Sequence, residues 1–318
     1  MRKLLPNKAF KRDSCRVAFL VCGDFCGENG LRKVGLGGTH PLTQRYNFRR
    51  LMRHTIYNKV ARSTGILTVF LGEEKISQGS CFCFLDSGEV LTAAHVVTGR
   101  FPIQQDDVND PEAKYFVKFA NVPVLEYKVK FCAITIQVEA FKDPIQIDLA
   151  WLKPKQDFDV SYPAISANVN PPNLGDEVLI AGYSDEIELP FLVDKIIDRD
   201  YSGVREFFDA MDKGYLADMT GPMIKRAYVG NHRTIIAGQS ESGIELQCDV
   251  MYLDNGMHSG ASGGPVVNMS GDVVGIITQQ RAVTKASQSE VPSLVVPSGS
   301  TVAISLKPLL AIGAMMAK

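Results

Sequence analysis

The apolar residues of this chain are arranged in many short runs rather than in long stretches. The runs are rich in Val, Ile, Leu and Phe, and residues such as Gly, Pro, Asn and Asp separate them. Examples are GILTVFL, EVLTAAHVV, AITIQVEAF, DEVLIAGY and GDVVGIIT. Short apolar runs bounded by turn residues are typical of β-strands joined by tight turns. The pattern therefore predicts an all-β protein.

Length and composition fit one two-lobed domain or two small domains. The chain has 318 residues, of which 45% are hydrophobic and 22% are charged, so it can bury a sizeable core and does not resemble a disordered chain. A membrane-spanning helix needs roughly 20 apolar residues, and no stretch approaches that length. The apolar run from Val17 to Gly23 is also short for a secretory signal. We therefore expect a cytoplasmic protein without a membrane segment.

The N-terminal segment differs in charge from the rest of the chain. Residues 1–62 contain 14 Lys and Arg against 3 Asp and Glu, whereas the other residues contain 20 against 32. The segment could be an arm for nucleic acid or membrane, a targeting peptide, or unpacked chain. One stretch of this segment, NKAFKRDSCRVAFLVCGDF, also resembles the translated recombination repeat that flanks bacterial integron gene cassettes. In that case the working protein would begin near Met52. We expect residues 1–55 to be poorly ordered and residues 56–318 to form the functional domain.

The chain contains an odd number of cysteines, which disfavours a framework of disulfides. Only Cys81 and Cys83 form a tight pair, at alternate positions of an expected strand. Cys22 and Cys26 lack the second pair of ligands that a structural zinc site needs. The others are Cys15, Cys132 and Cys248. We expect free thiols in a reducing compartment and no metal site.

A histidine follows small residues at the end of an expected strand. Residues 65–97 predict three strands, with turns at Gly72 to Lys75 and at Asp86 to Gly88, and the third strand ends in Thr92-Ala93-Ala94-His95. A side chain on a rigid strand end can project into a cleft and act as a general base. A lone histidine is more often a structural residue, so His95 needs partners to count as catalytic.

A carboxylate stands at the head of the apolar segment IDLAWLK, residues 147–153. A carboxylate that enters a core must be paired or hydrogen-bonded to remain charged. A histidine that becomes protonated during catalysis is a natural partner for Asp148. An ordinary aspartate in a strand-initiating turn is the alternative.

The most specific segment is DNGMHSGASGGPVV, residues 254–267, in which Ser262 lies among glycines. Two apolar runs follow it, with Ser270-Gly271 as the expected hairpin turn. Glycines let the backbone turn sharply and bring N–H groups close to a reacting carbonyl, because no Cβ blocks the approach. The N–H groups of Gly260 and Ser262 would form an oxyanion hole. A flexible Gly/Ser linker fits poorly, since the segment runs directly into apolar strands.

The segments TAAHV, DLAWLK and GASGGPVV occur in the order His, Asp, Ser. Together they resemble the trypsin-like serine peptidases of the chymotrypsin fold, and specifically the bacterial HtrA/Deg type. The stretches LGDEVLIAGY and SGSTVAIS, and Asp254 eight residues before the serine, match further positions of that family. The resemblance implies two six-stranded antiparallel β-barrels, the first at about 63–155 and the second at about 172–306, with a polypeptide substrate in the cleft between them.

This resemblance makes His95, Asp148 and Ser262 the catalytic triad of a serine endopeptidase. His95 would take the proton of Ser262 Oγ as that oxygen attacks the peptide carbonyl, while Asp148 would orient the imidazole and balance its charge. Water would then hydrolyse the acyl-enzyme, without a metal or organic cofactor.

Two other classes of function compete with this interpretation. One is a catalytically silent module that keeps the fold for peptide binding or as a scaffold. Dead relatives usually lose a triad member or a glycine of the oxyanion loop, and neither is lost here. The other is a nucleic-acid-binding protein that uses the basic leader, but the remaining domain is acidic, which argues against it.

The resemblance also places the substrate pocket. Its walls would be Gly256, Met257 and His258, six to four residues before the nucleophile, and Ile277 and Thr278 after the serine hairpin. No carboxylate lies at these positions, which disfavours a demand for Lys or Arg. Met257 and Ile277 suggest a pocket for small or medium apolar side chains. His258 could read an acidic or amide side chain from the rim, or be a solvated loop residue.

Two stretches depart from the family pattern. The loop from Glu188 to Met223 is long, and apolar residues at helical spacing predict an inserted amphipathic helix near 200–219; they are Val204, Phe207, Phe208 and Met211. A helix bordering the pocket and the oxyanion hole could be a lid or switch, or could simply pack locally. The second departure is at the C-terminus, where we expect a short helix from Lys307 onward and no PDZ module. Substrate selection and any oligomer would depend on this domain or on a separate partner.

Overall fold

The structure is a computed structural model that describes residues 53–108, 110–137, 142, 144–184, 203–239, 245–279, 283–286, 294–297 and 299–316. Most of the basic leader, residues 1–52, therefore lies outside the described residues, as do Cys15, Cys22 and Cys26. The described chain begins with a helix at 53–63. Ile56 and Val60 lie one turn apart on this helix and are buried in one apolar cluster with Leu179 and Val267.

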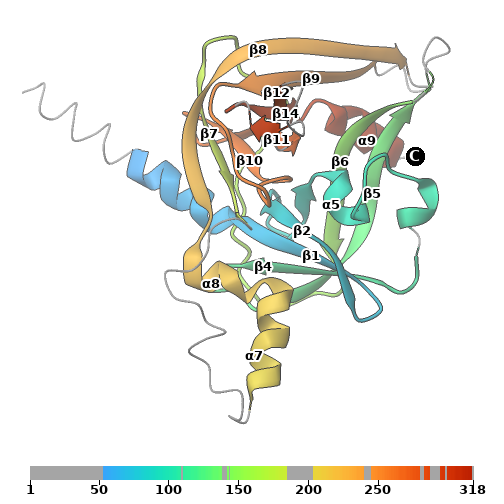
Figure 1. The fold of residues 1–318 in the computed structure, drawn as a ribbon, viewed down its shortest axis with the longest axis vertical. Helices are drawn as coiled ribbons and strands as arrows, with labels where there is room; N and C mark the ends of the chain where they lie inside the picture. The colour runs from blue at the N-terminus through green and yellow to red at the C-terminus, as the bar shows by residue number, and fades with distance from the viewer. Residues whose placement is uncertain are drawn as a thin grey trace, which may run out of the picture. The chain divides into compact units, whose positions relative to one another are not determined.

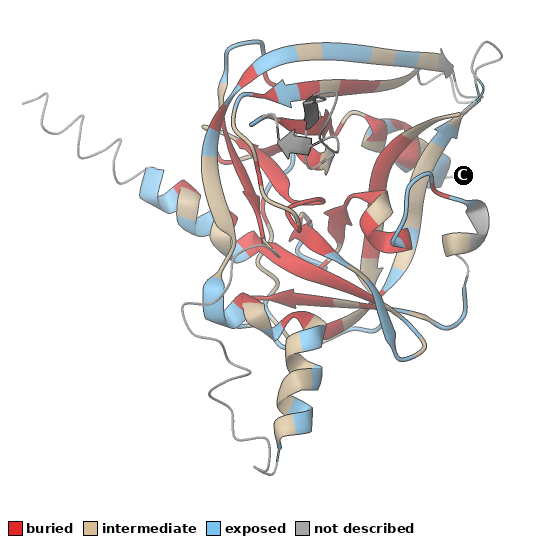
Figure 2. Cartoon of the chain, viewed as in Figure 1, coloured by how far each residue is buried: buried red, intermediate tan, exposed pale blue. Residues whose placement is uncertain are grey.

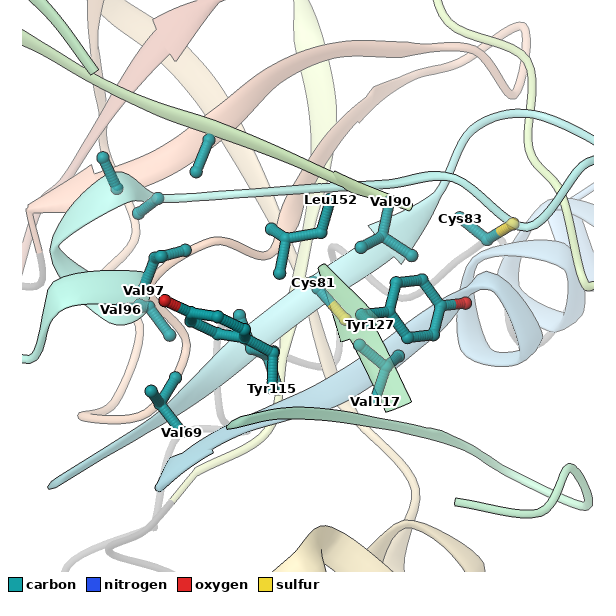
Figure 3. Close-up of a cluster of buried hydrophobic side chains, with 14 of the residues drawn as sticks. Val69, Cys81, Cys83, Val90, Val96, Val97, Tyr115, Val117, Tyr127 and Leu152 are labelled. Atoms are coloured by element: carbon teal, nitrogen blue, oxygen red, sulfur yellow. The ribbon is translucent and has the colours of Figure 1, made fainter. Parts of the chain in front are cut away.

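Six antiparallel strands close the first barrel in the order β1-β2-β3-β6-β5-β4 (Figure 1). Along the chain these are β1 (Thr64–Leu71), β2 (Glu74–Cys83), β3 (Val90–Thr92), β4 (Ala113–Phe119), β5 (Leu125–Ile136) and β6 (Ile145–Pro154). Two short helices, α5 (Ala94–Thr98) and η1 (Gln105–Val108), lie between β3 and β4. Successive strand residues point to opposite faces, so alternate residues fill the barrel. Figure 3 shows Val69, Cys81, Val117, Tyr127 and Leu152 converging in this core.

Six further antiparallel strands close the second barrel in the order β10-β11-β14-β9-β8-β7. They are β7 (Glu177–Gly182), β8 (Met223–Gln239), β9 (Glu245–Leu253), β10 (Pro265–Asn268), β11 (Val273–Gln279) and β14 (Thr301–Ser305). A separate two-stranded ribbon, β12 (Val283–Ala286) with β13 (Leu294–Pro297), lies between β11 and β14 in the chain. Ile180, Met251 and Val266 are among the buried residues of this second core.

The predicted all-β fold of two six-stranded barrels is confirmed. Figure 2 shows that buried residues follow the barrel strands, while the outer ends of the long strands are exposed. The expected C-terminal helix is present as α9 (Pro308–Met316), and it buries Ala311 and Ile312. None of the helices in the described part of the chain is long and apolar enough to cross a membrane.

The predicted insertion between β7 and β8 is helical but broken into three pieces. These are α7 (Val204–Ala210), the π-helical turn η2 (Met211–Tyr215) and α8 (Leu216–Thr220). The apolar residues that predicted the helix are only half-buried, and α7 has no buried residue. Instead Gly214 and Ala217 are buried. Gly214 has φ +94°, and an added Cβ there would lie 3.1 Å from Ile66 Cγ2, so this close approach requires glycine.

An ion pair between a buried lysine and a partly exposed aspartate attaches the insertion to the first barrel. Lys118 on β4 has a side chain only 2% exposed, and its Nζ donates to Asp218 Oδ1 on α8 at 2.6 Å and to Phe119 O at 2.7 Å. The same carboxylate oxygen accepts the N–H of Asn121 at 2.7 Å. Because the ammonium is removed from water, the folded state depends on this carboxylate to balance the buried charge.

Replacing Asp218 with alanine is therefore expected to lower the free energy of unfolding by about 3 kcal/mol, because the buried ammonium of Lys118 loses its counter-charge. Urea denaturation measures the change. Adding Lys118→Met should restore most of the loss by removing the buried charge. The exposed pair Lys155–Glu126 provides the control, since Glu126→Ala should cost less than about 1 kcal/mol. An equally small effect of Asp218→Ala would mean that water reaches the ammonium.

Candidate active site

His95 lies in the first turn of a short helix, not at the end of a strand. Strand β3 ends at Thr92, and α5 starts at Ala94, so the expectation of a strand through His95 is wrong. The helix turns the His95 backbone N–H toward Asp148 Oδ1, to which it donates at 2.9 Å. The ring nitrogen Nδ1 lies 2.7 Å from Asp148 Oδ2. One carboxylate therefore holds both the backbone and the ring of His95, while the side chain stays 23% exposed.

Asp148 lies inside β6, three residues after its start, with a side chain 8% exposed. In addition to the two contacts from His95, its Oδ2 accepts a short hydrogen bond from Thr278 Oγ1 on β11. Three donors thus satisfy the buried carboxylate, which allows it to remain charged. Thr278 was predicted only as a pocket residue. Its contact with Asp148 joins residues 130 positions apart, so no local pattern could have indicated it.

Ser262 lies in the loop between β9 and β10 and is 1% exposed. Its Oγ donates to Thr278 O at 3.5 Å, and within the described residues it forms no hydrogen bond with the ring of His95. Hydrogen bonds of this kind are often long or unformed before substrate binds. Thr278 therefore contacts both Asp148, through its hydroxyl, and Ser262, through its carbonyl.

The two glycines after Ser262 are required by close backbone approach. A Cβ on Gly263 would lie 2.1 Å from Ser80 O, and one on Gly264 would lie 1.9 Å from Ala181 O. Gly263 also has φ +85°. A side chain at Gly263 would displace the backbone of the first barrel, and one at Gly264 would displace that of the second. These two glycines therefore allow the loop that carries Ser262 to pack between the barrels.

Three of the backbone N–H groups around Ser262 donate to carbonyl groups. Ala261 N donates to His258 O at 3.3 Å, Gly263 N to Ile277 O at 2.7 Å, and Gly264 N to Ala261 O at 2.9 Å. No hydrogen bond to the described residues uses the N–H of Gly260 or of Ser262. These are the two N–H groups that the sequence indicated for the oxyanion hole.

The predicted pocket residues differ in exposure. Met257 is 6% exposed and Ile277 is fully buried, and both belong to the core of the second barrel. His258 is half-buried. The carbonyl of Gly256 accepts a hydrogen bond of 2.7 Å from Lys225 Nζ on β8. Sequence reasoning missed Lys225, because its partner lies 31 residues away.

The cysteines of the described chain are free thiols and are poor nucleophiles. Burial raises the pKa of Cys83, Cys132 and Cys248 to about 12, and the negative charge of Asp148 acts in the same direction on Cys132. Burial also raises the pKa of Cys81. All four thiols are therefore protonated at neutral pH, which leaves Ser262 as the candidate nucleophile. Within the described residues, no group of three or more His, Cys, Asp or Glu side chains is arranged to hold a metal ion.

A histidine held by an aspartate on one β-barrel, and a serine in a glycine-rich loop of a second barrel, is the arrangement of chymotrypsin-like serine hydrolases. The sequence matches the trypsin-like peptidase domain over residues 79–276, which is more than half of the chain. The chain therefore belongs to the trypsin-like peptidase family.

The proteins that are similar to this chain include a serine protease and a protease of known structure. Serine protease HTR4 of Rattus norvegicus is 25% identical over 294 residues, which cover 90% of this chain but 46% of that protein. The chain thus spans about half the length of this relative. Among solved structures, the HtrA-type protease AlgW with a tripeptide has a TM-score of 0.46 and 16% identity, over 83% of this chain and 62% of that one. The match of residues 79–276 to the trypsin-like peptidase domain confirms the predicted family, and the similarity to serine protease HTR4 agrees with the predicted HtrA type.

Proposed function

We propose that this protein is a serine endopeptidase that hydrolyses polypeptides through His95, Asp148 and Ser262. The observation that carries the proposal is the contact of 2.7 Å between His95 Nδ1 and Asp148 Oδ2. With Nδ1 protonated and donating to Asp148, Nε2 is left as the base. A protein that used His95 only as a core residue would not need a buried carboxylate on its ring.

The reaction proceeds through an acyl-enzyme. His95 Nε2 takes the proton from Ser262 Oγ as this oxygen attacks the carbonyl carbon of the peptide bond. The oxyanion receives hydrogen bonds from the N–H groups of Gly260 and Ser262. The protonated His95, stabilised by Asp148, gives its proton to the leaving amine, and water then attacks the acyl-enzyme with His95 again as the base.

The residue before the cleaved bond is small or medium and apolar. Met257 and Ile277, two of the predicted walls, are apolar and lie in the core of the second barrel, and none of the predicted walls carries a carboxylate. The ammonium of Lys225 beside Gly256 adds a positive charge, which disfavours Lys or Arg in the substrate. A cleavage profile from a peptide library tests this preference.

A catalytically silent peptide-binding module of the same fold is the second candidate. The observation that favours it is the position of Ser262, which is 1% exposed and directs its hydroxyl to Thr278 O. In such a module the cleft would bind a peptide without cutting it.

Labelling with a fluorophosphonate probe separates the two candidates. The folded parent is expected to take up one probe per chain, and peptide mapping should place it on Ser262, because only an activated serine reacts with this reagent. Heat-denatured protein is the control and should not react. A folded parent that binds peptides but takes up no probe would favour the silent module.

A further inference from the structure

One residue of the first barrel contacts the loop that carries Ser262 at two points. Ser80 lies on β2, is fully buried, and has no place in the triad. Its backbone N–H donates to Ser262 O at 2.8 Å. Its side-chain hydroxyl donates to Gly260 O, also at 2.8 Å. Ser80 therefore holds the carbonyl groups of the same two residues whose N–H groups face the proposed oxyanion.

Gly260 needs an external constraint more than its neighbours do. It has φ +85° and no side chain, so its backbone can adopt both positive and negative φ at little cost. The peptide unit is planar, so anchoring the Gly260 carbonyl also fixes the orientation of the unit that joins it to Ala261. The Gly260 N–H belongs to the preceding peptide unit, which is joined to the held unit through Gly260 Cα. With one of the two units held, fewer combinations of φ and ψ let this N–H turn away from a bound carbonyl.

The hydroxyl of Ser80 can point in only one useful direction. A serine hydroxyl has a single hydrogen to donate and two acceptor positions. Tyr183 N donates to Ser80 Oγ at 2.8 Å, which occupies one acceptor position and leaves the hydrogen directed to Gly260 O. The Ser80 carbonyl is held in turn by Thr92 Oγ1 at 2.7 Å. These two bonds hold Ser80 in place independently of its contact with Gly260.

We propose that Ser80 is a positioning residue for the oxyanion hole. By holding the Gly260 carbonyl, its hydroxyl restricts the backbone at Gly260 and so keeps the Gly260 N–H in the orientation that stabilises the transition state. It touches neither substrate nor the reacting atoms. The inference depends on the proposed serine-hydrolase function, because an oxyanion hole has a role only there. It assigns to the first barrel a part in organising the catalytic loop of the second.

The test compares Ser80→Ala with a matched control, Ser63→Ala. Ser63 is also a buried serine whose hydroxyl donates to a backbone carbonyl, that of Val60 at 3.2 Å, but it lies at the end of the helix at 53–63, just before β1. The reaction is labelling by a peptide-linked fluorophosphonate, followed over a range of probe concentrations. It yields the first-order rate constant at saturation and the half-saturating concentration separately.

Ser80→Ala is expected to lower the saturated rate constant by about 10- to 100-fold. Loss of an entire oxyanion donor costs roughly 10²- to 10³-fold, and here the Gly260 N–H remains but is less well oriented. The half-saturating concentration should change less than about two-fold, because ground-state binding does not use the hole. Ser63→Ala should leave both values within about two-fold of the parent, even if its melting temperature falls.

Other results would overturn the inference. A Ser80→Ala protein that labels at the parent rate, or that changes only the half-saturating concentration, would show that the hydroxyl does not act on the transition state. Ser80→Thr keeps the hydroxyl and should retain the rate to within about three-fold. An equal loss in the Ala and Thr variants would reduce Ser80 to a packing role. If the parent itself does not label, the proposed function fails, which is a distinct outcome.

Discussion

Replacing either Ser262 or His95 with alanine is expected to lower kcat for peptide hydrolysis by about 10⁶-fold, while substrate binding changes little. Ser262→Ala removes the attacking oxygen, and His95→Ala removes the group that accepts its proton. Because the two act as one unit, the double variant should be no slower than either single variant. Cleavage of fluorescently labelled casein, with fluorophosphonate labelling alongside it, provides the measurement.

Ser270→Ala is a suitable control for this experiment. Ser270 lies in the turn between β10 and β11, eight residues after Ser262, and its backbone rather than its side chain bonds to Asn268. This variant should keep the parent activity. If Ser262→Ala or His95→Ala cleaved casein as fast as Ser270→Ala does, the measured hydrolysis would come from another site or from a contaminating enzyme.

Asp148→Asn is expected to lower kcat by about 10⁴-fold, with the fold intact. The asparagine amide can donate a hydrogen bond to His95 Nδ1, which would leave the proton on Nε2 and so remove the base facing Ser262. The amide oxygen would take the place of Oδ1 and still accept the bond from His95 N, while the amide nitrogen would take the place of Oδ2. Its second N–H can donate to Thr278 Oγ1, whose own hydrogen would turn away, so little structural change is expected. Steady-state kinetics and a melting curve measure the two parts of this prediction.

Asp272→Asn is the matched change at a non-catalytic position. Asp272 lies in the turn between β10 and β11 and accepts a hydrogen bond from the distant Ser166. The Asn variant should keep its activity within about two-fold of the parent. Activity of Asp148→Asn at the same level would mean that Asp148 is a structural aspartate of β6. It would leave the orientation of His95 to other groups.

The short apolar runs and the three motifs in the order His, Asp, Ser were sufficient to predict the fold and the candidate site. Strand formation depends on local alternation and on turn residues, which a sequence displays directly. The glycines around Ser262 were equally readable, because a run of Gly and Ser before apolar strands has few other uses. The local structure at His95 was less readable: the alanines before it fit both a strand end and the first turn of α5.

Contacts between distant segments could not be read from the sequence. Thr278 reaches Asp148 across 130 residues, Lys118 pairs with Asp218 across 100, and Ser80 meets Gly260 across 180. Each pair depends on how two barrels, or a barrel and an insertion, are packed together. The apolar stripe of the insertion was misleading for the same reason: Gly214 and Ala217, which look unremarkable in sequence, are the residues that the first barrel buries.

The sequence by itself determined the fold class, the order of the candidate catalytic residues and the glycines that a sharp serine loop requires, because these are expressed in local spacing. Only the tertiary structure decided which groups satisfy Asp148, which residue holds Gly260 and what attaches the insertion. A buried hydroxyl or ammonium is stabilised by whichever partner packing brings within about 3 Å, and that partner is set by the closure and docking of the barrels rather than by neighbouring residues in the chain.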